Sequence, residues 1–207
     1  MQTQTNATPV SSTQLPSIAA VVIHEVRDYA TWKSAFDAHA EGRKKAGIFT
    51  AHINRDIDNP NLITAYLGAR SAEGLKSFIA SPDLKETMQR AGVKGAPQIA
   101  LITPVEDETV KDRSLPGAIV RHEVADFKTW KKAFDEHAGA RGAAGIVGHA
   151  LNRSVEQPNL VVIYLQAERL EQLREFAASP NLKDTMQKAG VQGQPAISFV
   201  TGQEWTA

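Results

Sequence analysis

Two pairs of side chains that could carry acid–base chemistry recur in this sequence at a spacing of 98 residues: Glu25 with Glu123, and Tyr66 with Tyr164. A glutamate that is buried in an apolar pocket has a raised pKa and can act as a general base near neutral pH. A tyrosine hydroxyl can bind a phenolic or carbonyl oxygen. These four residues are therefore candidate catalytic groups for a small oxygen-bearing substrate. In the alternative interpretation, the glutamates form ion pairs at the edge of the fold and the tyrosines fill its interior.

Four further positions are candidate ligand-binding residues. Asn54 and Asn152 occur at the same spacing and could stabilise an oxyanion. At two other positions the copies differ: His52 stands against Ala150, and Arg121 stands against Ile23. If one copy has specialised, mismatches of this kind are where its function should be sought.

The remaining histidines favour a structural interpretation. His24 matches His122, and His39 matches His137, so four imidazoles could in principle ligate a metal. No spacing typical of a metal site, such as HExxH, is present. His24 is flanked by valines, and His39 continues a helical stripe of aromatic residues. We therefore expect hydrogen-bonded structural histidines and no metal.

The elements that position these residues are repeated as a whole. From Val21 to Thr103 the first copy aligns with the second without an insertion, and about half of the positions are identical. A repeat of this length is a small domain and not a solenoid unit. We expect a disordered tail at 1–16, modules at 17–103 and 117–207, and a charged, proline-bracketed linker at 104–116.

Each copy alternates strand-like and helix-like segments. In the first copy, β-rich runs at 19–26, 48–56, 61–69 and 98–103 predict strands. Asp28 is placed to cap a helix that ends at Gly47, and helices are expected over 71–80 and from Ser81 to Gly92. This order is the βαββαβ pattern of a ferredoxin-like module. One such sheet has a bare apolar face, so we predict an α+β fold in which the two modules pack sheet to sheet as a pseudo-dimeric barrel.

With this element order, the helical segments SPDLKETMQRAG and SPNLKDTMQKAG make the chain resemble the dimeric α+β barrel superfamily, in particular its antibiotic biosynthesis monooxygenase branch. The resemblance implies an internal cavity and a range of activities, among them cofactor-independent oxygenases, cyclases, isomerases and heme-degrading enzymes. Heme-degrading relatives place their proximal histidine where Met88 and Met186 stand here. No cofactor is therefore expected.

Composition excludes several classes of function. The 23 basic and 23 acidic residues cancel and form no basic patch, which argues against nucleic-acid and anionic-membrane partners. No apolar run is long enough to cross a bilayer, and the chain has no cysteine. We expect a cytoplasmic monomer with an internal pseudo-two-fold axis, although a higher oligomer is possible.

The expected function is binding of a small apolar or aromatic molecule, with a cofactor-independent monooxygenase, cyclase or isomerase as the catalytic hypothesis. The alternative is a non-catalytic ligand-binding or structural module. Strand alternation places Thr50, His52, Asn54, Thr64 and Tyr66 inside the barrel, so this lumen is the predicted site.

Overall fold

The computed structural model describes residues 15–206 as two modules of alternating strands and helices. The first contains β1 (Ile18–Val26), α1 (Tyr29–Ala38), α2 (Ala40–Lys45), β2 (Ile48–Arg55), β3 (Leu62–Ala69), α3 (Ala72–Ile79), α4 (Pro82–Arg90) and β4 (Val93–Asp107). The second contains β5 (Gly117–Val124), α5 (Phe127–Glu136), α6 (Ala138–Ala143), β6 (Ile146–Ser154), β7 (Leu160–Ala167), α7 (Leu170–Ala178), α8 (Pro180–Lys188), β8 (Val191–Val200) and β9 (Glu204–Thr206). Except for Leu15 and Pro16, the predicted tail lies outside the described residues.

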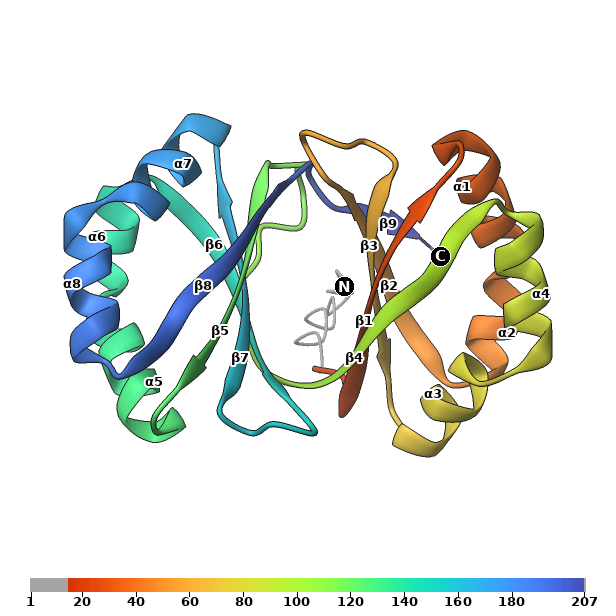
Figure 1. The fold of residues 1–207 in the computed structure, drawn as a ribbon, viewed down its shortest axis with the longest axis horizontal. Coiled ribbons are helices and arrows are strands. Elements are labelled where there is room, and N and C mark those ends of the chain that lie inside the picture. Colours follow the sequence, from red (N-terminus) through yellow and green to blue (C-terminus); the bar gives the residue numbers. More distant parts are fainter. Residues whose placement is uncertain (1–14, 207) are drawn as a thin grey trace, which may run out of the picture.

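The predicted α+β architecture is confirmed. The antiparallel strands follow the order β8-β5-β7-β6-β4-β1-β3-β2-β9. Figure 1 shows two sheets between two outer layers of helices, α1–α4 on one side and α5–α8 on the other. Each module therefore covers the bare sheet face of its neighbour, as its apolar composition requires.

Reciprocal pairing between the modules closes the barrel. The end of β4 crosses over and pairs with β6, from Ile102 opposite Ser154 to Asp107 opposite Ala150. At the equivalent place on the other side, Val200 bridges Asp56 and β9 pairs with β2. The final strand of each module thus extends the partner sheet, and the pseudo-two-fold relation includes the backbone hydrogen bonds.

Two features of the linker and the C-terminus differ from expectation. The segment 104–116 begins as strand, because its first four residues continue β4 along the edge of β6. The short strand β9 was not predicted, since a three-residue strand carries no recognisable alternation. Both segments form strands because they pair with the other module. Local sequence patterns do not predict pairing of this kind.

Local signals set the helix boundaries. Asp28 accepts a hydrogen bond from the backbone nitrogen of Thr31 at 2.8 Å, which caps α1 as predicted. The expected single helix is divided at His39, which ends α1 and precedes α2. Gly47 and its counterpart Gly145 then stop the chain at φ values of 76° and 85°, a conformation that favours glycine.

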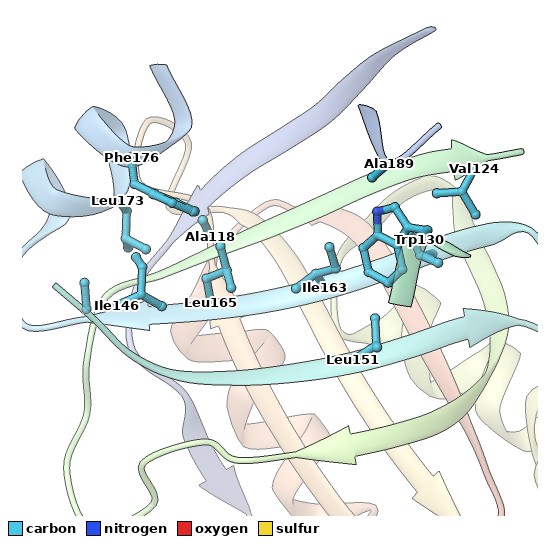
Figure 2. Packing of buried hydrophobic residues seen from close by; sticks show 12 residues of the cluster. Ala118, Val124, Trp130, Ile146, Leu151, Ile163, Leu165, Leu173, Phe176 and Ala189 are labelled. Carbon is cyan, nitrogen blue, oxygen red and sulfur yellow. The ribbon is translucent and has the colours of Figure 1, made fainter. Parts of the chain in front are cut away.

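Apolar residues pack between each sheet and its helices. In the second module this core includes Trp130 of α5, Ile163 and Leu165 of β7, and Phe176 of α7 (Figure 2). The first module divides its buried residues between two clusters, one around Leu75 and Phe78 and one around Trp32. The helix-facing layer is therefore less continuous in the first module.

Candidate functional site

Three cavities are lined by side chains that could bind a ligand or transfer a proton. The first lies between sheet and helices in the first module and has a volume of about 460 Å³; we call it the helix–sheet cavity. Its counterpart in the second module has a volume of about 60 Å³. The third, of about 230 Å³, lies between the two sheets and is the lumen cavity.

The helix–sheet cavity is walled mainly by apolar side chains. Trp32 and Phe36 on α1 face it with their rings 5.1 Å apart. β3 contributes Ala65 to the wall, and α4 contributes Leu84 and Met88. Apolar walls with few polar groups are typical of sites for small organic ligands.

His24 is the most unusual polar group in this wall. It lies on the helix-facing side of β1, is 6% exposed, and its ring centroid is 5.2 Å from that of Trp32. Within residues 15–206 neither ring nitrogen has a hydrogen-bond partner, so the expectation of a hydrogen-bonded His24 was wrong. Burial lowers its pKa to about 4, and the imidazole is neutral at pH 7.

A second imidazole stands at the edge of the cavity. His39 lies between α1 and α2, and its Nε2 is 2.7 Å from a carboxylate oxygen of Asp83 in the first turn of α4. In the second module, His137 Nε2 is 2.7 Å from the amide oxygen of Asn181. Among the described residues, the first module therefore joins this histidine to a carboxylate and the second joins it to an amide, and a carboxylate partner can orient an imidazole.

A guanidinium also belongs to the polar part of the wall. Arg43 of α2 is buried, donates a hydrogen bond to the backbone oxygen of Phe36, and lies 3.9 Å above the centre of the Phe36 ring. Arg141 makes the same contacts with Phe134. Since both modules have this arrangement, it belongs to the shared scaffold.

The lumen cavity contains most of the predicted site residues. His52, Asn54, Tyr66, Asn152 and Tyr164 all line it. Burial raises the pKa of Tyr66, and raises that of Tyr164 to about 12. Both hydroxyls therefore remain protonated at neutral pH and can donate hydrogen bonds.

Three predicted site residues lie outside the cavities. Glu25 has a side chain 43% exposed and forms an ion pair with Lys94 at 2.9 Å. The hydrogen bond and charge of Lys94 lower the pKa of Glu25, which is the opposite of the shift that a general base requires. Glu123 and Arg121 on β5 are exposed. By alternation these residues share strand faces with Val21 and Ile119, which line the lumen cavity, but their own side chains reach solvent.

Sequence reasoning missed the helix–sheet cavity as a site. The face of β3 that carries Ala65 has small or aliphatic residues, which is the pattern of ordinary packing against helices. One signal was available: Ala65 aligns with Ile163, so one copy lacks three carbon atoms in the middle of this face. A small residue in one copy opposite a large one in the other indicates unequal space.

A heme or a metal ion would need suitable ligand side chains in these cavity walls. Where the resemblance implies a heme ligand on the late helix, α4 contributes Leu84, Thr87 and Met88 to the cavity and no imidazole. Helix-ligated heme therefore does not fit these residues. In the described part of the chain, no cluster of three or more histidine, aspartate or glutamate side chains could hold a metal ion.

Comparison with known proteins identifies the fold. The chain is similar to an anthrone oxidase-like protein with a TM-score of 0.66 and 11% identity, covering 96% of both chains. It is similar to a candidate monooxygenase from Lactobacillus acidophilus with a TM-score of 0.60 and 13% identity, covering 94% of this chain and 97% of the other. A ferredoxin-fold protein from Listeria monocytogenes, related to antibiotic biosynthesis monooxygenases, matches with a TM-score of 0.51 and 8% identity, over 91% and 96% of the two chains.

These similarities confirm the predicted ferredoxin-like fold and its likeness in structure to the antibiotic biosynthesis monooxygenase group. No family model matches the sequence, and no curated protein matches it. Among the helices of residues 15–206, none has the length and apolar character needed to span a membrane. Because one fold serves many chemistries, the activity has to be argued from the cavities.

Proposed function

We propose that the first module binds one small aromatic molecule in the helix–sheet cavity and assists removal of a proton from it. The observation that carries this proposal is the environment of His24, a buried imidazole without a partner in the wall of an apolar cavity of about 460 Å³. A buried polar group without a hydrogen bond costs about 1–3 kcal/mol. A ligand oxygen or hydroxyl placed in the cavity would satisfy this imidazole.

The two imidazoles are suited to different tasks. The pKa of about 4 makes His24 a weak base at neutral pH, so its proposed role is to hold an oxygen of the ligand through a neutral hydrogen bond. His39 has the carboxylate of Asp83 beside it, which would orient its ring, and its proposed role is to accept the proton of the ligand. Together they support deprotonation of a phenol or of an acidic C–H group next to an aromatic ketone.

This proton transfer is the first step common to the three reactions that the resemblance implies, namely cofactor-independent oxygenation, cyclisation and isomerisation. The similarity to an anthrone oxidase-like protein suggests anthrone as a test compound. Anthrone has three fused rings, a ketone oxygen for His24 and an acidic methylene group. Binding without chemistry is the alternative function.

The experiment is exchange of the anthrone methylene protons for deuterium in D₂O without oxygen, followed by NMR. The wild-type protein should accelerate the exchange. Asp83→Asn reproduces the Asn181 found in the second module and should lower the rate at least tenfold while leaving binding nearly unchanged. His24→Phe keeps an aromatic ring and removes the nitrogens, so it should weaken binding of the ketone.

Matched substitutions in the second module serve as controls. Asn181→Asp and His122→Phe should leave the exchange rate unchanged, because the cavity beside them has a volume of only about 60 Å³. Saturable binding with no accelerated exchange would leave the ligand-binding function and reject proton transfer. No binding of any aromatic probe would reject both.

A further inference from the structure

The lumen cavity is a second concave site, and the proposed function does not use it. Its volume of about 230 Å³ is half that of the helix–sheet cavity, and both sheets contribute to its wall. A cavity of 150 Å³ in another protein accommodates benzene, so this space suits a single ring with one substituent. The sheets separate it from the helix–sheet cavity, since the two are lined by opposite faces of β1 and β3.

Three aromatic side chains form one end of the lumen cavity. The rings of His52 and Tyr66 are stacked, with centroids 4.5 Å apart and planes 8° apart. The indole of Trp205 on β9 lies 4.7 Å from the His52 ring at an angle of 54°. All three side chains line the cavity, so a planar aromatic ligand could make stacked or edge-to-face contacts with them.

Two polar atoms of this wall lack partners within the described residues. They are Nδ1 of His52 and Oε1 of Gln203, both inaccessible to solvent. Gln203 as a whole is 8% exposed. The amide oxygen can only accept a hydrogen bond, so a ligand that satisfies it must carry a donor such as a hydroxyl.

Charge in the cavity is already paired. The Asp107 carboxylate accepts hydrogen bonds from Thr109 at 3.0 and 2.5 Å and is 3.0 Å from the ammonium group of Lys111. A charged ligand would have to compete with this pair. The cavity therefore favours a neutral molecule.

The pseudo-two-fold axis does not repeat this site. The positions of His52, Gln203 and Trp205 correspond to Ala150, Val105 and Asp107 in the other half. The aromatic end and both unpartnered atoms are consequently found on one side only. A residue that the scaffold requires would recur in both halves. Since these three residues do not recur, they are candidates for contacts with a ligand.

We propose that the lumen cavity is a binding site for a neutral single-ring phenol, whose ring packs against the aromatic cluster of His52, Tyr66 and Trp205 and whose hydroxyl donates a hydrogen bond to Gln203. The phenol hydroxyl oxygen can in turn accept a hydrogen bond from a tyrosine hydroxyl of the wall. This site is independent of the helix–sheet cavity.

The three tryptophans of the chain allow each cavity to be observed separately. Trp32 lines the helix–sheet cavity, Trp130 its counterpart and Trp205 the lumen cavity. Full-length protein labelled with 5-fluorotryptophan should give three fluorine NMR signals, assigned by replacing each tryptophan with phenylalanine. Titration with phenol should shift the Trp205 signal saturably. Toluene, which lacks the hydroxyl, should bind about tenfold more weakly.

Variants copied from the other half test the contacts. Gln203→Val and His52→Ala should each weaken phenol binding about tenfold at the Trp205 signal. Ala65→Ile narrows the helix–sheet cavity and should leave this titration unchanged. The proposal is overturned if the Trp205 signal does not saturate, if toluene binds as well as phenol, or if both variants bind like the wild type. Failure at Trp205 with binding at Trp32 would reject the lumen site and leave the proposed function standing.

Discussion

The helix–sheet layers of the two modules have the same polar groups but differ in the space beside them. His24 and His122 are 6% and 5% exposed, and neither has a partner in residues 15–206. Each lies beside a tryptophan, Trp32 or Trp130. Yet the adjoining cavities have volumes of about 460 and 60 Å³. An unpartnered histidine is therefore inherited by both copies, and what differs is the volume of the cavity whose wall it forms.

Two structural differences account for the unequal space. In the first module the small Ala65 lines the cavity wall, whereas the second module has Ile163 at this position. Ile163 belongs to the buried core shown in Figure 2. The larger cavity also reaches residues of β4, such as Gly95 and Pro97. The lining of the smaller cavity includes no residue of the equivalent strand β8. The two copies thus share one scaffold but differ in packing: the first module has room for a ligand, and the core of the second is nearly filled.

The largest expected effect comes from making the second module resemble the first. Ile163→Ala should lower the free energy of unfolding by about 2–5 kcal/mol, because it removes three buried carbon atoms and leaves a void. Urea denaturation measures this loss. In protein labelled with 5-fluorotryptophan, the Trp130 signal should then respond to 2-naphthol, whereas in the wild type we expect this compound to shift only the Trp32 signal. A silent Trp130 signal in the folded variant would show that Ile163 is not what closes the site.

Acid should act on both modules alike. Burial lowers the pKa of His24 and of His122 to about 4 from the ordinary value of 6.5. The unfolded chain therefore binds protons between these values and the folded chain does not, so stability falls as the pH drops from 6.5 to 4. The loss is about 3 kcal/mol per histidine at most, and these groups add none below pH 4.

The measurement is urea denaturation of the wild type, His24→Phe and His122→Phe at pH 7 and pH 4.5. Each substitution should remove a similar share of the acid sensitivity. A large share removed by one variant alone would mean that the two imidazoles are not in equivalent environments, contrary to their similar burial.

The reverse exchange should close the first module. Ala65→Ile places three carbon atoms in an existing void, so it should stabilise the protein by about 0.5–2 kcal/mol. It should also weaken 2-naphthol binding at the Trp32 signal at least tenfold, because the added side chain occupies ligand space. Ala65→Val is the graded control with an intermediate effect. Unchanged affinity would place the ligand in the part of the cavity nearer β4.

Sequence reasoning predicted the fold because its signals are periodic or repeated. Alternation identified the inner faces of the strands, and Asp28 and Gly47 marked the first helical segment correctly. It placed Tyr66 and Asn54 in the lumen, where the structure has them. It could not show that Glu25 lies beyond the enclosed space, since alternation gives the face of a sheet and not the depth along a strand. Nor could it give the distance between helices and sheet, which depends on packing over many residues.

The smallest expected effect tests whether the modules also agree where no cavity is involved. Asp28 and Asp126 cap α1 and α5 through the same bond, each accepting from a backbone nitrogen at 2.8 Å, from Thr31 and Thr129. Replacing either aspartate with alanine should lower the free energy of unfolding by about 1 kcal/mol. Equal losses in urea denaturation would show that the helices are held equally at their first turns, so the difference between the modules lies in how the layers are filled. A much smaller loss at Asp28 would instead show that the first helix layer is loosely held, and the larger cavity would then reflect mobility of α1 as well as the small side chain at position 65.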